Sequence, residues 1–227
     1  MFKYAPREFN RLLINFGCIR IGTLHDFRRT EHKKGIADKD EGRKTVSHRI
    51  NDASIFKPSD LLRRNTKDQR SLIDFEIFHP ESQLHKVAIS DCIVIKDFNH
   101  PNLFIYCMST GYSSSAIASL EGSNSCIQIV DQRKFFKSLT DTIDSITPVI
   151  FRGCHKVSYE SREVEWNGRD WGRHPALIKD PSYRNQQEVR AIWQPRFERE
   201  IQPLLIGNWR IGSACKEIDD PKEFGQT

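Results

Sequence analysis

The stretch Leu103-Phe104-Ile105-Tyr106-Cys107-Met108-Ser109-Thr110-Gly111-Tyr112 begins as an apolar run and ends in two hydroxyl side chains and a glycine. An apolar run of this length, closed by a turn former, is typical of a strand buried in a sheet. We expect this strand to span 103–108, with the hydroxyl groups at a sheet edge. Further strands are predicted at 18–22, 71–78, 87–95, 126–130, 149–159, 189–193 and 203–206.

Two segments have the periodicity of amphipathic helices. Residues 7–17 end at Gly17, which stops the first helix, and Asp131 is a suitable N-cap for the second. The expected apolar faces are Phe9, Leu12, Leu13 and Phe16 in the first helix and Phe135, Phe136, Leu139 and Ile143 in the second. Residues 160–175 are predicted to form a polar, tryptophan-containing loop. Because strands outnumber helices and occur in neighbouring groups, we expect one α+β domain (1–227) with a mixed, largely antiparallel sheet and flanking helices.

The net charge lies in one segment of the chain. The 227 residues include 35 Lys and Arg against 30 Asp and Glu, a formal charge of +5. Residues 25–70 hold thirteen of the basic and eight of the acidic residues, so they account for all of this charge. We predict a long polar loop or insertion at 28–70, which is either a solvated surface loop or a basic arm that binds nucleic-acid phosphates. The candidate contacts are Arg28, Arg29, Lys33, Lys34, Arg43 and Lys44.

Several classes of protein have no support in the sequence. No apolar run is long enough to cross a membrane, and the first residues lack the apolar core of a secretory signal, so we expect a cytoplasmic protein without a membrane partner. The six cysteines are scattered, which favours reduced core residues. Glycine-rich nucleotide motifs, zinc-protease motifs and EF-hand loops are absent from the sequence, and no metal is expected.

Two strands contain polar groups that are unusual for a buried sheet. Arg20 interrupts the apolar strand 18–22, where a guanidinium needs either a core carboxylate or a bound anion. Ser109 and Thr110 end the strand 103–108, where they either form a turn or present hydroxyl groups to a cleft. Both interpretations remain open for each position.

A third polar group lies at the entrance of the strand 189–193. Side chains two residues apart in an extended chain share a face, so Gln186 and Glu188 are expected to point into the same cleft. A carboxylate beside an amide at a strand entrance suits an active site. The alternative is an ion pair between Glu188 and Arg190.

The order of these three segments resembles the ADP-ribosyltransferase fold, which has an Arg or His on an early strand, a Ser-Thr-Ser-like strand and a Gln/Glu-x-Glu at a late strand. The chain is most similar to the DUF2971-type bacterial family. This resemblance covers most of the chain outside 30–75 and 160–178. It rests on Phe2-Lys3-Tyr4, the helix and strand at 9–22, the strand 104–109, the strand and helix at 126–136, and Lys179-Asp180 with Tyr183, Glu188 and Arg190.

The resemblance implies a split sheet and an enzyme that uses NAD as substrate. It assigns catalysis to Glu188, which would stabilise the positive charge that develops on the ribose, and to Gln186, which would bind the acceptor. The NAD-binding residues that it implies are Arg20 for the pyrophosphate or adenosine ribose, Ser109 and Thr110 for the nicotinamide ribose, and Tyr112 or Tyr183 for stacking on the nicotinamide. Ser109 would also brace Glu188. In this sequence Cys-Met-Ser-Thr (107–110) replaces the ideal Ser-Thr-Ser.

By the same resemblance, the protein is expected to be a toxin or phage-defence effector that modifies nucleic acid. Single-stranded RNA is favoured over single-stranded DNA as acceptor, and an antitoxin protein is a possible partner. Two other functions remain open. One is a non-catalytic nucleic-acid-binding or protein-binding domain of the same fold. The other is a metal-dependent nuclease that uses carboxylates such as Asp170 and Glu188.

Overall fold

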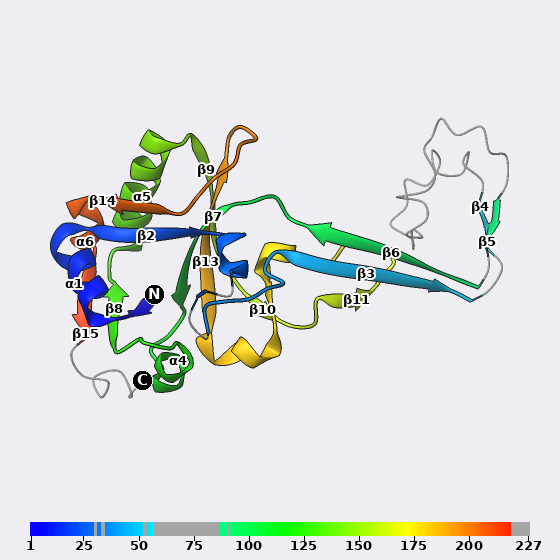
Figure 1. Cartoon of the computed structure of the whole chain (residues 1–227), viewed down its shortest axis with the longest axis horizontal. Helices are drawn as coiled ribbons and strands as arrows, with labels where there is room; N and C mark the ends of the chain where they lie inside the picture. The colour runs from blue at the N-terminus through cyan, green and yellow to red at the C-terminus, as the bar shows by residue number, and fades with distance from the viewer. Residues whose placement is uncertain (30, 33–34, 52–53, 57–86, 90, 219–227) are drawn as a thin grey trace.

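The molecule consists of a body and a projecting arm (Figure 1). The computed structural model describes the whole chain apart from residues 30, 33–34, 52–53, 57–86, 90 and 219–227. The predicted strand at 71–78 therefore lies outside the described residues. In the described part, no helix has the length and apolar character needed to cross a membrane.

The body is built on an eight-stranded sheet in which every strand pair is antiparallel. Six strands follow the order β14-β2-β7-β1-β8-β15, and β13 and then β9 continue the sheet from the other edge of β7. The strands are β1 (Phe2–Ala5), β2 (Cys18–Thr23), β7 (Phe104–Ser109), β8 (Ser125–Ile129), β9 (Val149–Lys156), β13 (Glu188–Pro195), β14 (Leu204–Gly207) and β15 (Cys215–Ile218). The predicted α+β class with a mixed, largely antiparallel sheet is confirmed.

Two strands, β1 and β2, pair with different parts of the same edge of β7. β2 pairs with its beginning, where Thr23 lies opposite Phe104, and β1 pairs with its end, where Phe2 lies opposite Ser109. Residues 106–108 lie between these pairings on that edge, whereas β13 pairs with the whole other edge. The sheet is therefore split between β1 and β2.

Helices cover the sheet around this split. The long helix α5 (Gln132–Ile146) begins at Asp131, whose side chain accepts a hydrogen bond from the Lys134 amide, as predicted. Its predicted apolar face is buried against β7, β9 and β13. The shorter helices are α1 (Arg7–Phe16), α4 (Ser114–Ser119) and α6 (Trp209–Gly212), and the 3₁₀ helices are η1 (Asp26–Arg28), η2 (Pro175–Leu177) and η3 (Pro181–Gln186).

The helix α1 has the predicted bounds but buries a different face. Phe9, Leu12 and Phe16 are 58%, 43% and 62% exposed, whereas Asn10 and Leu13 are buried. The side of α1 that faces the sheet carries Asn10, whose amide donates to the Ser125 hydroxyl over 2.5 Å. Packing of α1 against this polar position of β8 and against α6 leaves most of the apolar stripe exposed.

The predicted polar loop or insertion at 28–70 contains a strand that the sequence did not predict. Residues Arg43–Ile50 form β3, which pairs along its whole length with β6 (Cys92–Asn99) and projects from the body as the arm (Figure 1). The predicted strand 87–95 is divided between β5 (Val87–Ile89), which pairs with β4 (Ser54–Phe56), and the first half of β6.

The predicted loop at 160–175 also contributes to the arm. Its strand β11 (Glu163–Glu165) pairs in parallel with β3, and the Trp171 ring packs at 5.0 Å from the Phe98 ring of β6. The short strands β10 (Ser158–Tyr159) and β12 (Ile178–Lys179), also parallel, connect this region to the body. All six cysteines are free thiols, but only Cys126 is fully buried, so they are less central to the core than expected.

The turn between α1 and β2 has no room for a side chain at Gly17. Gly17 has a φ of 66°, and a Cβ added there would lie 1.8 Å from the Asn208 backbone oxygen. Because both the left-handed backbone and the clash disfavour a side chain, we expect Gly17→Ala to lower the free energy of unfolding by at least about 2 kcal/mol. Urea denaturation measures this change. Gly111→Ala, where an added Cβ makes only an ordinary 3.5 Å contact, is the control, and an equal effect of both substitutions would contradict the prediction.

Candidate functional site

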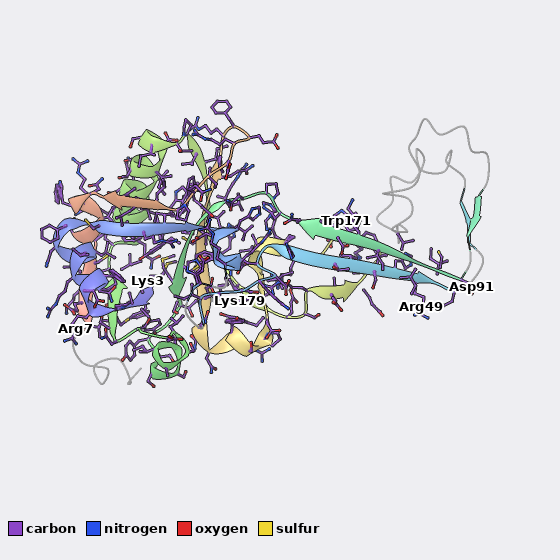
Figure 2. All side chains as sticks on the ribbon, in the orientation of Figure 1. Lys3, Arg7, Arg49, Asp91, Trp171 and Lys179 are labelled. Carbon is purple, nitrogen blue, oxygen red and sulfur yellow. The ribbon has the colours of Figure 1, made fainter. Side chains whose placement is uncertain are left out.

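A cavity of about 650 Å³ opens at the split in the sheet. Its size falls within the range of roughly 300–1,000 Å³ that is usual for small-molecule sites. Its lining includes the apolar side chains of Phe9, Leu12, Ile19 and Leu205 and the charged side chains of Lys3, Arg20, Glu41, Lys179, Glu188 and Arg190. Figure 2 shows Lys3 and Lys179 in the body, whereas Trp171 lies on the arm. The cavity therefore offers both apolar surface and charged groups to a ligand.

Glu188 lines the cavity with both carboxylate oxygens ion-paired. Its Oε2 is 2.8 Å from Lys179 Nζ, and its Oε1 is 2.6 Å from Arg190 Nε. Burial by itself would raise the pKa of Glu188, but the charges of Arg190 and Lys179 outweigh this effect and hold its pKa well below the usual range. The carboxylate thus stays ionised, and the ion pair with Arg190 that the sequence left open is present.

Lys179 joins Glu188 to Gln186. Its ammonium also donates to Gln186 Oε1 over 2.8 Å, and Gln186 Nε2 donates to the Gly35 carbonyl over 2.8 Å. Both Gln186 and Glu188 line the cavity, so the structure brings the predicted pair together. The chain at 186–188 is not the extended segment that the prediction assumed, because Gln187 has a left-handed backbone with a φ of 45°. The shared lysine sets their positions.

Arg190 connects this group to a segment far away in the sequence. It is 1% exposed, and its Nη1 and Nη2 lie 2.6 and 2.8 Å from the two carboxylate oxygens of Glu41. Nη1 also donates to the Ala176 carbonyl. Burial would lower the pKa of Arg190, but Glu188 and Glu41 raise it well above its usual value. We define Glu41, Arg190, Glu188 and Lys179 as the ionic cluster.

The segment 35–41 is fastened over the ionic cluster by polar contacts. Besides the contacts of Gly35 and Glu41, the Tyr183 hydroxyl donates to the Ala37 carbonyl over 2.9 Å. The two Arg162 Nη atoms donate to the Asp38 carboxylate over 3.1 and 2.6 Å. Part of the predicted polar loop is therefore an ordered strap at the site. Glu41 could not be singled out from the sequence, because its partner Arg190 lies 149 positions away.

Arg20 lines the cavity, but it is not the buried guanidinium that its apolar neighbours suggested. Its side chain is 48% exposed, and Nη2 lies 2.7 Å from the buried carboxylate of Asp26. His32 Nε2 lies 3.3 Å from the same Asp26 oxygen. Of the two interpretations that the sequence allowed, the carboxylate partner is the one observed.

Ser109 is directly opposite Glu188 in the register of β7 and β13. Its hydroxyl donates to the Gln186 carbonyl over 2.5 Å, so the support that Ser109 gives to Glu188 acts through the backbone two residues before it. Ser109 lines the cavity, but the exposed Thr110 is outside its lining and donates to Gln187 Oε1 over 3.2 Å.

The two tyrosines expected to stack on nicotinamide also lie outside the lining of the cavity. The Tyr112 ring packs near Phe2 and Tyr4, with ring centroids 6.4 and 6.3 Å away. Tyr183 lies under the Lys179 ammonium, 4.6 Å from its ring centroid. Tyr112 thus belongs to a hydrophobic cluster, and Tyr183 supports the strap and the lysine.

The predicted nucleic-acid contacts have mixed surroundings. Lys44 is 3% exposed and donates to the carbonyls of Trp171 and Arg173, so its prediction as a phosphate contact is wrong. Arg28 donates to the Glu41 carbonyl over 2.7 Å and to Asn99 Oδ1 over 2.8 Å. Arg29 and Arg43 are exposed, and Lys33 and Lys34 lie outside the described residues.

Asp170, the second carboxylate of the nuclease hypothesis, lies away from Glu188. Asp170 is exposed in the turn after β11, hydrogen-bonded to Asn167 and to the Gly172 amide, and it is not part of the cavity lining around Glu188.

Comparison of the chain with protein-family models, curated proteins and solved structures gives no match.

The bidentate pair between Glu41 and Arg190 predicts a large effect on stability. Glu41→Ala leaves a buried guanidinium with only one carboxylate, so we expect the free energy of unfolding to fall by about 3 kcal/mol. Asp141→Ala removes the exposed pair with Lys137 and is expected to cost less than about 0.5 kcal/mol. Urea denaturation compares the two variants, and similar small losses would show that the strap does not depend on Glu41.

The lowered pKa of Glu188 predicts how its contribution to stability depends on pH. The contribution is fully present above the ordinary carboxyl pKa of 4.5 and is lost as the pH falls through the lower pKa of the folded protein. Wild type should therefore exceed Glu188→Gln in stability near neutral pH, and the difference should shrink in acid below 4.5. Denaturation curves at several pH values measure it. Glu163→Gln, at an exposed position, should give a difference that is small at every pH.

Proposed function

We propose that this chain is an NAD-dependent ADP-ribosyltransferase. The observation that supports this function best is the carboxylate of Glu188, whose pKa is lowered by Arg190 and Lys179 and which faces a small-molecule cavity with the Gln186 amide on the same lysine. The resemblance in sequence points to the same residues. On the same resemblance we propose that the protein is a toxin or phage-defence effector with an antitoxin as partner.

The residues around the cavity suit a dinucleotide. Phe9, Leu12 and Leu205 offer apolar surface to an aromatic base, and Lys3 and Arg20 offer positive charge to a diphosphate. NAD would supply a glycosidic bond to a cationic nicotinamide, which leaves as the neutral ring while positive charge develops on the ribose. NAD thus matches the apolar and the charged residues of the lining in chemical character.

Glu188 would stabilise that developing positive charge. Because its oxygens are fixed by Lys179 and Arg190, no reorientation is needed during the reaction. Arg190 is shared with Glu41, so it neutralises Glu188 only in part. Gln186 would orient the acceptor, and Ser109 holds the backbone of Gln186 in place.

For the acceptor we propose nucleic acid, with single-stranded RNA preferred. An unpaired base enters a cavity at lower cost than a paired one. Arg29 and Arg43 are the exposed members of the predicted basic set and are available for phosphate contacts. RNA, single-stranded DNA and protein are compared directly in the experiment below.

One observation favours a second function, that of a non-catalytic binding domain. Both oxygens of Glu188 are engaged by cations of the same chain, which is also what a purely structural carboxylate requires. In such a domain, neutralising Glu188 would change stability and leave the binding function intact.

The test measures nicotinamide release from NAD and transfer of adenylate label to RNA, single-stranded DNA or protein. We expect Glu188→Gln, which keeps the size of the side chain, to lower the rate by roughly 100-fold or more, as losses of electrostatic stabilisation do. Affinity for NAD, measured by calorimetry, should change far less.

Glu163→Gln on the arm is the matched control and should keep the wild-type rate. Circular dichroism and thermal unfolding show that each variant is folded. Folded wild type that releases no nicotinamide with any acceptor would overturn the proposal in favour of the binding domain. Equal rates for Glu188→Gln and wild type would remove Glu188 from the mechanism.

A further inference from the structure

The cations that line the cavity differ in their partners. Lys179 and Arg190 belong to the ionic cluster, and Arg20 is paired with Asp26. Lys3 also lines the cavity, but within the described ranges it has no carboxylate at ion-pair distance. It is the cavity's one lysine or arginine, among the residues described, that lacks an anion.

Lys3 extends from β1 into the split of the sheet. Its Nζ donates over 3.0 Å to the carbonyl of Cys107, which lies in the stretch of β7 that neither β1 nor β2 pairs with. The ammonium also lies 4.9 Å from the Tyr106 ring centroid. An ammonium has three N–H donors, and the Cys107 carbonyl is its only hydrogen-bond acceptor among the described residues.

The surroundings of Lys3 make an unpaired ammonium costly. The titratable groups that act on it are Cys107 on β7, Glu188 on β13, Arg20 on β2 and Lys179 on β12. Burial is the largest effect and lowers the pKa of Lys3, although Cys107 and Glu188 act in the opposite direction. A buried charge that lacks a counterion is stabilised by a bound anion.

We infer that Lys3 binds the diphosphate of the nucleotide substrate, a role that the sequence resemblance gives to Arg20. The ammonium lies in the split, on a cavity that is lined both by the ionic cluster and by the apolar side chains Phe9, Leu12 and Leu205. A diphosphate at Lys3 would connect a ribose near Glu188 with a base on these apolar side chains. Phosphate oxygens suit a lysine because they accept its donors from several directions. Arg20, already neutralised by Asp26, adds less. The inference rests on the proposed function for the identity of the nucleotide.

Calorimetric titration of the full chain with ADP, NAD and adenosine tests this assignment. Lys3→Met keeps the length of the stem and removes the charge, so we expect its affinity for ADP and NAD to fall about tenfold or more, as the loss of a charged hydrogen bond does. Adenosine, which has no phosphate, should bind wild type and Lys3→Met alike. Lys3→Arg should recover most of the affinity for ADP.

Two further variants separate the diphosphate contact from other effects. Arg20→Met should weaken ADP binding less than Lys3→Met, and Lys137→Met, an exposed lysine on α5, should leave it unchanged. The inference is overturned if wild type binds no ADP, if Lys3→Met binds ADP as wild type does, if adenosine binding falls equally, or if Arg20→Met has the larger effect. Wild type that binds ADP through Lys3 but releases no nicotinamide from NAD would overturn the proposed function alone.

Discussion

A guanidinium that is only 1% exposed needs full neutralisation, and Arg190 obtains it from two carboxylates, Glu188 two residues before it and Glu41 on the strap. Removing either partner leaves a buried charge insufficiently compensated, which is among the costliest changes in a folded protein. Arg190 therefore contributes both to the position of the strap and to the orientation of Glu188. Arg28, which donates to the Glu41 carbonyl and to Asn99, extends this dependence to the base of the arm.

The split in the sheet has a simple origin in connectivity. β1 and β2 are joined by the ten residues of α1, and the two strands pair with opposite ends of β7. The edge of β7 at 106–108 is consequently left open, and the cavity forms there. An open edge inside a protein leaves carbonyl groups that need donors. Lys3 satisfies the carbonyl of Cys107, so the feature that creates the cavity also brings a cation into it.

Sequence patterns succeeded where the deciding contacts are local or purely apolar. The strand at 103–108 and the helix after Asp131 follow from runs and spacings of apolar residues, and Gln186 and Glu188 are only two residues apart. The same reasoning failed for α1, because its packing side contains Asn10, which binds Ser125 of a strand distant in sequence.

Charge patterns were the least informative because they do not reveal partners. Lys44 looks like an exposed cation in the sequence, yet its acceptors are carbonyls 127 and 129 positions away. Glu41 and Lys3 were missed for the same reason, since Arg190 and Cys107 lie 149 and 104 positions from them. Only the folded chain shows that one cation of the polar loop is structural while a lysine near the N-terminus faces the cavity.

The ionic cluster is difficult to explain by stability alone. Taking two carboxylates and two cations out of water costs several kcal/mol per ion, and well-packed apolar residues of similar volume usually give equal or greater stability. What an apolar core cannot provide is a charge held at one place beside a cavity. Glu188 has this property, because Lys179 and Arg190 fix both of its oxygens and Glu41 takes up part of the charge of Arg190. Such a carboxylate meets a positive charge on a ligand without rearrangement, which is the condition for electrostatic catalysis. The physical cost of the cluster thus supports the proposed function independently of any sequence resemblance.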